Sequence, residues 1–322
     1  MKANVRSVSR LLALLLVSGC TIADSTPDPY EVIRVVSWNV QEDSFVTHQT
    51  EFRALMHRAD ANIWLLDEVA PWTDADQIEK AVMQPGSDAA LHINFGRSGG
   101  RQVGVIASVY RLESLQEFSG VVPYPEAERH EIWQRMSPVD RTRSDWSMDG
   151  GIPVNAAVIL TGTRRLLAVV ADLQCCGDSP ESWQEFRRMV EVREIRRLVR
   201  QVLDRISVDG IILAGDFNLV TSHAPLQVLT GPYRAPHTHL TPVESYHLDG
   251  VSNWTWDGRG TPFPSNDLDY QLYDSQALEL RTSLILDSED LPPEELEQLG
   301  IDRKTSSRLS DHRPLLVEYD WR

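Results

Sequence analysis

The sequence has little cysteine and too little positive charge to balance its acids. Its 322 residues include 3 cysteines, none in the CxxC or Cys/His spacing of a zinc site. The 47 acidic residues outnumber the 31 lysines and arginines, so the formal net charge is -16 at pH 7. Proteins that bind nucleic acid non-specifically are normally basic. We therefore expect no stable nucleic-acid partner, although a local basic patch or a metal could reverse the field at a site.

Long hydrophobic runs are also missing. The run LLALLLV is too short to span a bilayer stably, and it lies between the basic stretch MKANVRSVSR and SGC. This pattern predicts a secretory signal peptide over residues 1–19. LVSGC also resembles the lipobox of bacterial lipoproteins, which implies a lipid on Cys20 and a tether over residues 20–30. The alternative is an ordinary signal peptide with an incidental cysteine.

From this pattern we expect an exported, membrane-anchored bacterial lipoprotein that faces the periplasm or the cell exterior. Its remaining thiols would be the adjacent Cys175 and Cys176. Free thiols tend not to persist in an oxidising compartment, and a bond between these two cysteines would stiffen a single turn. The redox state of the pair stays open.

Hydrophobic patterning predicts buried strands combined with amphipathic helices, which is an α/β fold. Strands are predicted at residues 31–40, 61–66, 101–110, 154–162, 164–172, 209–220, 268–274 and 313–320, and helices at 50–59 and 179–206. The arginines of the second helix alternate with glutamates, which predicts a solvated face. No linker interrupts the pattern, so we expect one domain over residues 31–322.

Several predicted strands end in, or are flanked by, polar or acidic side chains. These are Asn39, Glu68, Asp216, Asn218, Asp269 and Asp311, with His312 beside the last of them. Each alone is more often a turn or cap residue. Together at one sheet edge they would offer oxygen ligands to a hard cation such as Mg²⁺.

The segments SWNV, LLDEV, LAGDFN, LDY and SDHRPL, in that order, resemble the endonuclease/exonuclease/phosphatase superfamily, the fold of DNase I and the apurinic endonucleases. The resemblance runs from about Val35 to Tyr319, and GDFN with SDHRP carries most of its specificity. It implies a DNase I-like four-layer α/β sandwich, with two mixed β-sheets face to face and helices outside.

The same resemblance implies a metal centre for Mg²⁺ or Mn²⁺. Glu68 would be the principal ligand, Asn39 would ligate or position the ion, and Asp311 would bind it or support its ligands. Whether one ion or two act stays open.

The resemblance also implies catalytic roles. Asp216 would orient or deprotonate the attacking water, and Asn218 would hold that water or the phosphate. His312 would face the phosphate and pair through its far nitrogen with Asp269. The implied reaction is in-line attack of water on phosphorus.

One position departs from the family pattern. Many members have a phosphate-contacting histidine at the end of the strand before the long helix, where this chain has Asp172. An anion there repels a phosphate unless a cation intervenes. Three accounts stay open: Asp172 binds a second metal, pairs with an arginine such as Arg141 or Arg143, or marks weakened activity.

These features together predict a metal-dependent phosphoesterase that acts on a phosphodiester or phosphomonoester. The substrate would be a nucleotide, an oligonucleotide or a phospholipid headgroup. The alternative is a weakened or inactive lipoprotein of the same fold that binds metal or phosphate.

Overall fold

The computed structural model describes residues 32–87, 89–143 and 147–322. The predicted signal peptide, Cys20 and the tether lie outside the described residues. Within the described ranges, no helix combines the length and apolar character that crossing a membrane requires.

Two six-stranded sheets form the framework. The first sheet contains, in spatial order, β11 (Leu278–Ile285), β12 (Leu315–Trp321), β1 (Val32–Glu42), β2 (Ile63–Val69), β4 (Val103–Ser108) and β3 (His92–Phe95). The second contains β5 (Arg111–Ser114), β6 (Val154–Thr161), β7 (Arg164–Ala171), β8 (Gly210–Asp216), β10 (Asp269–Tyr273) and β9 (Thr241–Pro242). Both sheets are mixed, because β1 and β2 pair in parallel, as do β7 and β8, while the other pairs are antiparallel.

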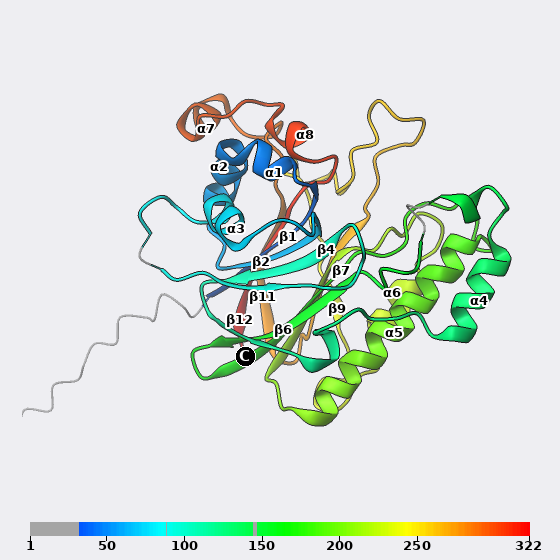
Figure 1. Ribbon diagram of the computed structural model, residues 1–322. Helices are drawn as coiled ribbons and strands as arrows, with labels where there is room; N and C mark the ends of the chain where they lie inside the picture. Colours follow the sequence, from blue (N-terminus) through cyan, green and yellow to red (C-terminus); the bar gives the residue numbers. More distant parts are fainter. Residues whose placement is uncertain (1–31, 88, 144–146) are drawn as a thin grey trace, which may run out of the picture.

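Helices cover the outer face of each sheet (Figure 1). The first sheet carries α1 (Ser44–Thr47), α2 (Gln49–Ala59), α3 (Ala75–Val82), α7 (Pro293–Leu299) and α8 (Thr305–Leu309). The second carries α4 (Glu126–Arg135), α5 (Trp183–Arg205) and α6 (Ala224–Leu229). Two short 3₁₀ helices lie beside them: η1 (Gln116–Phe118) packs Phe118 into the same apolar cluster, and η2 (Asp140–Thr142) accepts a hydrogen bond from Trp183 at Asp140. A third apolar cluster lies between the sheets. The predicted α/β sandwich is therefore confirmed.

Burial on both faces explains the composition of the central strands. Residues of β1 alternate between the apolar cluster under the helices, which holds Val36 and Trp38, and the cluster between the sheets, which holds Ile33 and Val35. A strand with two buried faces needs a nearly continuous apolar run, and this run made the strand predictable.

Some elements differ from the sequence prediction. The strand β11 and the helix α7 lie between residues 274 and 313, where the sequence predicts no strand or helix. Within α5, Arg187 and Arg188 are buried, so the expectation of a wholly solvated arginine face is wrong for these two residues. Arg187 pairs with Glu191 and Arg188 with Glu185, and these ion pairs make their burial tolerable.

Candidate active site

The strand directions bring the polar strand ends to one edge of the two sheets. The parallel strands β1 and β2 end at Glu42 and Val69, and β7 and β8 end at Ala171 and Asp216. The antiparallel strand β10 begins at this edge, because Asp269 pairs with Asp216. Since β1 and β2 also pack against β8, the two sheets meet here and their polar residues face a common site.

Backbone geometry fixes the acidic end of β8. Gly215 has a φ of +132°, and a Cβ on it would lie 2.0 Å from the carbonyl oxygen of Ala171 in β7. Only glycine fits such an approach between two strands. Asn218 follows with a φ of +51°, and its backbone N–H donates to Asp216 Oδ1 at 2.9 Å. The sequence GDFN thus aims the Asp216 carboxylate into the site.

His312 joins two of the predicted acids. Its Nδ1 lies 2.7 Å from Asp269 Oδ2, and its Nε2 lies 3.6 Å from Asp216 Oδ2. Asn39 Nδ2 donates to the same Asp216 oxygen at 3.3 Å. The contact between His312 and Asp269 is the one that the family resemblance implies.

A second group of acids lies beside the first. One carboxylate oxygen from each of Glu68, Asp172 and Asp216 falls within 4.8 Å of the others, and the same limit holds for one ligand atom each from Asp216, Asp269 and His312. Asn218 Nδ2 donates to Asp172 Oδ1 at 3.4 Å and to the carbonyl oxygen of Leu173 at 2.9 Å. Asp172 therefore lies in the candidate site and does not act as a distant turn residue.

The arginine account of Asp172 gains no support. In the described part of the chain Asp172 forms no ion pair, while the Arg141 guanidinium donates to the carbonyl oxygens of Trp133 and Gln134. The contact with Cys175 lowers the pKa of the Cys176 thiol against the opposing effect of burial, and the charges of Arg188 and then Arg143 lower it further.

Burial, together with the crowding of negative charge, shifts the pKa values of the site. Burial raises the pKa of Asp216 to about 8; the charge of His312 opposes this shift, and Asp269 and Glu68 add to it. Burial also raises the pKa of Asp172, with further increases from Glu68 and Asp216. For His312 burial acts downward, but Asp269 and Asp216 raise its pKa well above the usual value. The cluster therefore favours the imidazolium form of His312 and raises the pH at which Asp216 and Asp172 lose their protons.

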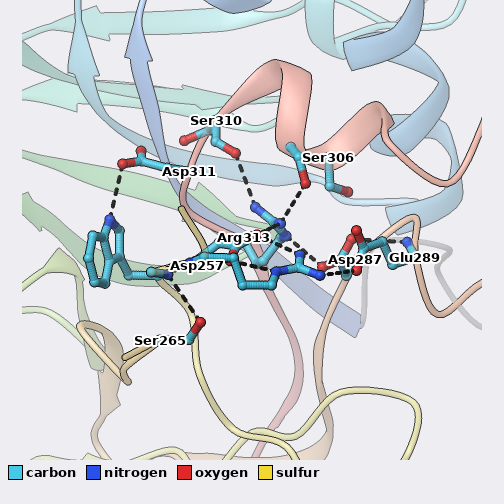
Figure 2. Close-up of polar contacts among 12 residues, drawn as sticks. Asp257, Ser265, Asp287, Glu289, Ser306, Ser310, Asp311 and Arg313 are labelled. Carbon is cyan, nitrogen blue, oxygen red and sulfur yellow. Dashed lines mark hydrogen bonds and ion pairs between the residues drawn. The ribbon is translucent and has the colours of Figure 1, made fainter. Parts of the chain in front are cut away.

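Asp311 lies at the margin of this cluster, and a tryptophan outside the cluster binds its carboxylate. Trp256 Nε1 donates to Asp311 Oδ2 at 3.0 Å, an interaction that the close-up of Figure 2 shows. The carboxylate is near enough for its charge to raise the pKa of Glu68, after the larger effect of burial. Asp311 belongs to neither of the two groups of possible metal ligands described above.

A buried arginine clamps the loop that carries Asp311 and His312. Arg313 donates from Nε to Asp287 Oδ2 at 2.6 Å and from Nη2 to Asp257 Oδ2 at 2.8 Å. Its Nη1 donates to the carbonyl oxygen of Ser310 at 3.0 Å, and these contacts converge on the guanidinium in Figure 2. These contacts tie three separate loops together next to His312 in the chain.

The residues present fit a divalent metal ion. Within the described residues, both carboxylate oxygens of Asp67 and the Oδ1 atom of Asp269 are buried without a hydrogen-bond partner. Buried carboxylates without partners are costly, and a nearby cation offsets that cost. The donors are oxygens and one imidazole, which suit Mg²⁺ or Mn²⁺. Glu68, Asn39 and Asp311, with the two groups described above, are the candidates to hold such an ion.

Sequence reasoning missed three contributors to the site. Asp67 stands directly before Glu68 in LLDEV, and its strand position beside a predicted metal ligand was the available signal. Gln102 Nε2 donates to Glu68 Oε2 at 2.7 Å, and Trp256 holds Asp311. No sequence pattern pointed to these last two contacts, because they join segments far apart in the chain.

The turn after Asp172 is shaped by an arginine as well as by its cysteines. Cys175 and Cys176 are free thiols with their sulfur atoms 2.7 Å apart. Arg188 Nη1 donates to the carbonyl oxygens of Gln174 at 2.6 Å and Cys176 at 2.8 Å. The helix α5 thus fixes the segment that leads away from the site.

Comparisons with known proteins agree with the fold and the order of the motifs. The model of the Endonuclease/Exonuclease/phosphatase family matches residues 36–312. The chain belongs to this family, whose members are generally phosphoester hydrolases, including nucleases. The comparison with curated proteins found no match.

Solved structures share the fold at low sequence identity. A humanized D. rerio TDP2 is 15% identical with a TM-score of 0.53, and the match covers 90% of this chain and 99% of that one. The endonuclease/exonuclease/phosphatase from Bacteroides vulgatus is 14% identical with a TM-score of 0.54, over 90% and 99%. The human nocturnin catalytic domain with bound sulfate is 17% identical with a TM-score of 0.51, over 91% and 95%.

Proposed function

We propose that this protein is a divalent-metal-dependent phosphoesterase that uses the cluster around Asp216 and His312. The observation that carries the proposal is the chain of contacts from Asp269 through His312 to Asp216, at the edge where both sheets present carboxylates. A bound Mg²⁺ or Mn²⁺ would supply positive charge against the phosphoryl oxygens.

Four side chains of the cluster would position the phosphate and transfer the proton. The imidazolium of His312, held in orientation by Asp269, places a positive N–H where a phosphoryl oxygen would bind. In its deprotonated form, which a nearby cation would favour, Asp216 accepts the proton of the attacking water, and Asn39 holds the carboxylate in place. The water oxygen forms a new bond to phosphorus while the bond from phosphorus to the ester oxygen breaks in line with it. The ester oxygen takes a proton from solvent and leaves as the alcohol, and Asp216 returns its proton to solvent.

A nucleotide, an oligonucleotide or a phospholipid headgroup is the proposed substrate class. The acidic net charge of -16 favours small esters over long duplex DNA. One relative by fold, D. rerio TDP2, was solved with a single-strand DNA product at 14% identity and a TM-score of 0.52. This likeness shows a shared fold alone, so an oligonucleotide is tested as one of several substrates.

The test measures hydrolysis by the purified protein with Mg²⁺, Mn²⁺ or EDTA. The substrates are bis(p-nitrophenyl) phosphate, a mononucleotide, a single-stranded oligonucleotide and glycerophosphocholine. We expect metal-dependent release from at least one ester, with Asp216→Asn and His312→Ala each lowering kcat by about 10²-fold or more. The exposed His239 provides a control, since His239→Ala should leave kcat unchanged.

Absence of turnover on every ester would reject the proposal. It would favour the alternative of an inactive protein that binds metal or phosphate. Activity that survives both Asp216→Asn and His312→Ala would place the chemistry elsewhere.

We also propose that the protein is exported, cleaved before Cys20 and anchored to a bacterial membrane by lipid on that cysteine. LVSGC and the preceding basic and apolar stretches support this proposal. Metabolic labelling with radioactive palmitate should mark the wild-type protein but not Cys20→Ser. Equal labelling of the two would exclude lipid attachment at Cys20.

A further inference from the structure

We propose that Glu68, Asp172 and Asp216 form a second cation site, filled by a hard divalent ion such as Mg²⁺ or Mn²⁺, with Glu68 contributing to both sites. Asp172 would contribute a carboxylate oxygen to this site. The ion would be a second one, beside the ion held near Asn39, Glu68 and Asp311. This inference deepens the proposed function and rests on it for what the ion does in hydrolysis.

The geometry brings three carboxylates together from three different strand ends. Glu68 comes from β2, Asp172 follows β7 and Asp216 ends β8, so the group spans both sheets. One oxygen of each lies within 4.8 Å of the other two, a spacing that a single ion can bridge. Asn218 and Gln102 donate to one oxygen of Asp172 and Glu68, respectively, and so fix both carboxylates.

No side chain supplies the charge that this group lacks. Among the described residues, Glu68 and Asp172 form no ion pair, and Asp216 has His312 at 3.6 Å as its cationic neighbour. His312 is also shared with Asp269 at 2.7 Å. One imidazolium therefore serves at least four carboxyl groups, which leaves a deficit of positive charge at Glu68 and Asp172.

Asp67 is the independent sign that a cation belongs there. Its side chain is 1% exposed, and neither carboxylate oxygen has a hydrogen-bond partner among the described residues. Along β2, Ile63 and Leu65 point into the space between the sheets, and Asp67 follows in the same alternation. This places its carboxyl group beneath the cluster, close enough for its charge to act on Asp172.

The site also has a route for an ion to enter. Glu68 and Asp172 are half-buried, whereas Asp67 and Asp216 are buried. The two half-buried carboxylates form an open side through which a hydrated ion can approach. Mg²⁺ usually keeps several waters, so an open side with few protein ligands suits it. There the ion would also offset the repulsion between Asp172 and a substrate phosphate.

Counting bound Mn²⁺ tests the inference without reference to activity. Mn²⁺ is titrated into the full-length chain at fixed pH, and free Mn²⁺ is measured by electron paramagnetic resonance. We expect two ions per wild-type chain. Asp172→Asn should retain one ion and weaken the other by about 10-fold or more.

Asp178→Asn is the matched control, because Asp178 is exposed on the same loop and loses the same charge outside the cluster. It should bind two ions with wild-type affinity. Asp172→His replaces an oxygen donor with an imidazole, so it should shift the preference of one site from Mg²⁺ towards Zn²⁺.

Anomalous diffraction from wild-type crystals soaked in Mn²⁺ locates the ions directly and does not depend on a variant that folds. A peak among Glu68, Asp172 and Asp216 supports the inference. One ion per wild-type chain, no peak at this position, or two ions of unchanged affinity in Asp172→Asn would overturn it.

Hydrolysis separates this inference from the proposed function. If the protein binds two ions but cleaves no ester, the second cation site is supported and the proposed activity is rejected. If it cleaves an ester with a single bound ion, the activity is supported and the second site is rejected.

Discussion

Asp311 illustrates how a single contact can decide the behaviour of a candidate ligand. Its Oδ2 atom accepts a hydrogen bond from the Trp256 indole at 3.0 Å, and its backbone carbonyl accepts one from Asp257 at 2.7 Å. Asp311 is thus held through its carboxylate and through its backbone, so its carboxylate is oriented before an ion arrives. Such outer contacts commonly change metal affinity by about 10–100-fold.

Trp256→Phe should therefore weaken Mn²⁺ binding by about 10-fold, because it removes the indole N–H and keeps an aromatic ring in place. The measurement is the same Mn²⁺ titration used to count ions. Trp133→Phe is the control, since Trp133 is an exposed residue of α4, which lies on the outer face of the second sheet. Equal affinity in all three proteins would show that the indole contact does not orient a ligand.

Among the structural elements, the contact between β7 and β8 sets the position of the acidic strand end. Gly215 approaches Ala171 closely with a positive φ, whereas Gly162, in the turn between β6 and β7, has a φ of +62° and no atom within 4 Å of its would-be Cβ. Substitution of Gly162 therefore measures the cost of backbone conformation alone, whereas substitution of Gly215 adds the cost of a steric clash.

Gly215→Ala should lower the free energy of unfolding by ~3 kcal/mol or more, because the new methyl group would force the strands apart. Gly162→Ala should cost about 1 kcal/mol, from conformation alone. Urea unfolding monitored by circular dichroism measures both. Similar losses for the two variants would mean that β8 can shift without penalty.

The sequence predicted elements well where a local pattern determined them. The buried strands β1, β2 and β8 carry long apolar runs, and the polar residues that end them pointed to the site. The strand β11 was missed because Leu278–Ile285 is an edge strand with exposed polar positions and no apolar run. The burial of Arg187 depends on Tyr124 and Glu191, and only the folded chain brings Tyr124 to the helix.

At the scale of the whole molecule, the carboxyl cluster opposes folding when no metal is bound. Burial raises the pKa of Asp67, Asp172 and Asp216, the last to about 8. The folded chain then holds protons that the unfolded chain has released above pH ~4. Because the folded state binds more protons, the free energy of unfolding falls as pH rises from ~4 to about 8. The raised pKa of His312 acts in the same direction, since its stabilising effect is lost as pH rises through the folded-state value.

In EDTA, the protein should therefore be less stable at pH 8 than at pH 5.5, by on the order of 1–3 kcal/mol. Mg²⁺ should restore more stability at pH 8, because it binds deprotonated carboxylates. Urea unfolding at both pH values, with and without Mg²⁺, provides the measurement. Asp216→Asn in EDTA should show a smaller pH dependence. Greater stability at pH 8 than at pH 5.5 in EDTA would contradict the assignment of raised pKa values.

The pairing of β1 with β12 constrains the order in which the chain can assemble. Val32–Ser37 pairs with Leu315–Asp320, so the first described strand takes a central place in its sheet only beside the last. A chain still emerging from the ribosome cannot close this sheet, and contacts of such long range form slowly. His312 lies just before β12, so the same late step completes the site. The candidate site of a nascent chain would therefore stay incomplete until residues 312–321 have left the ribosome.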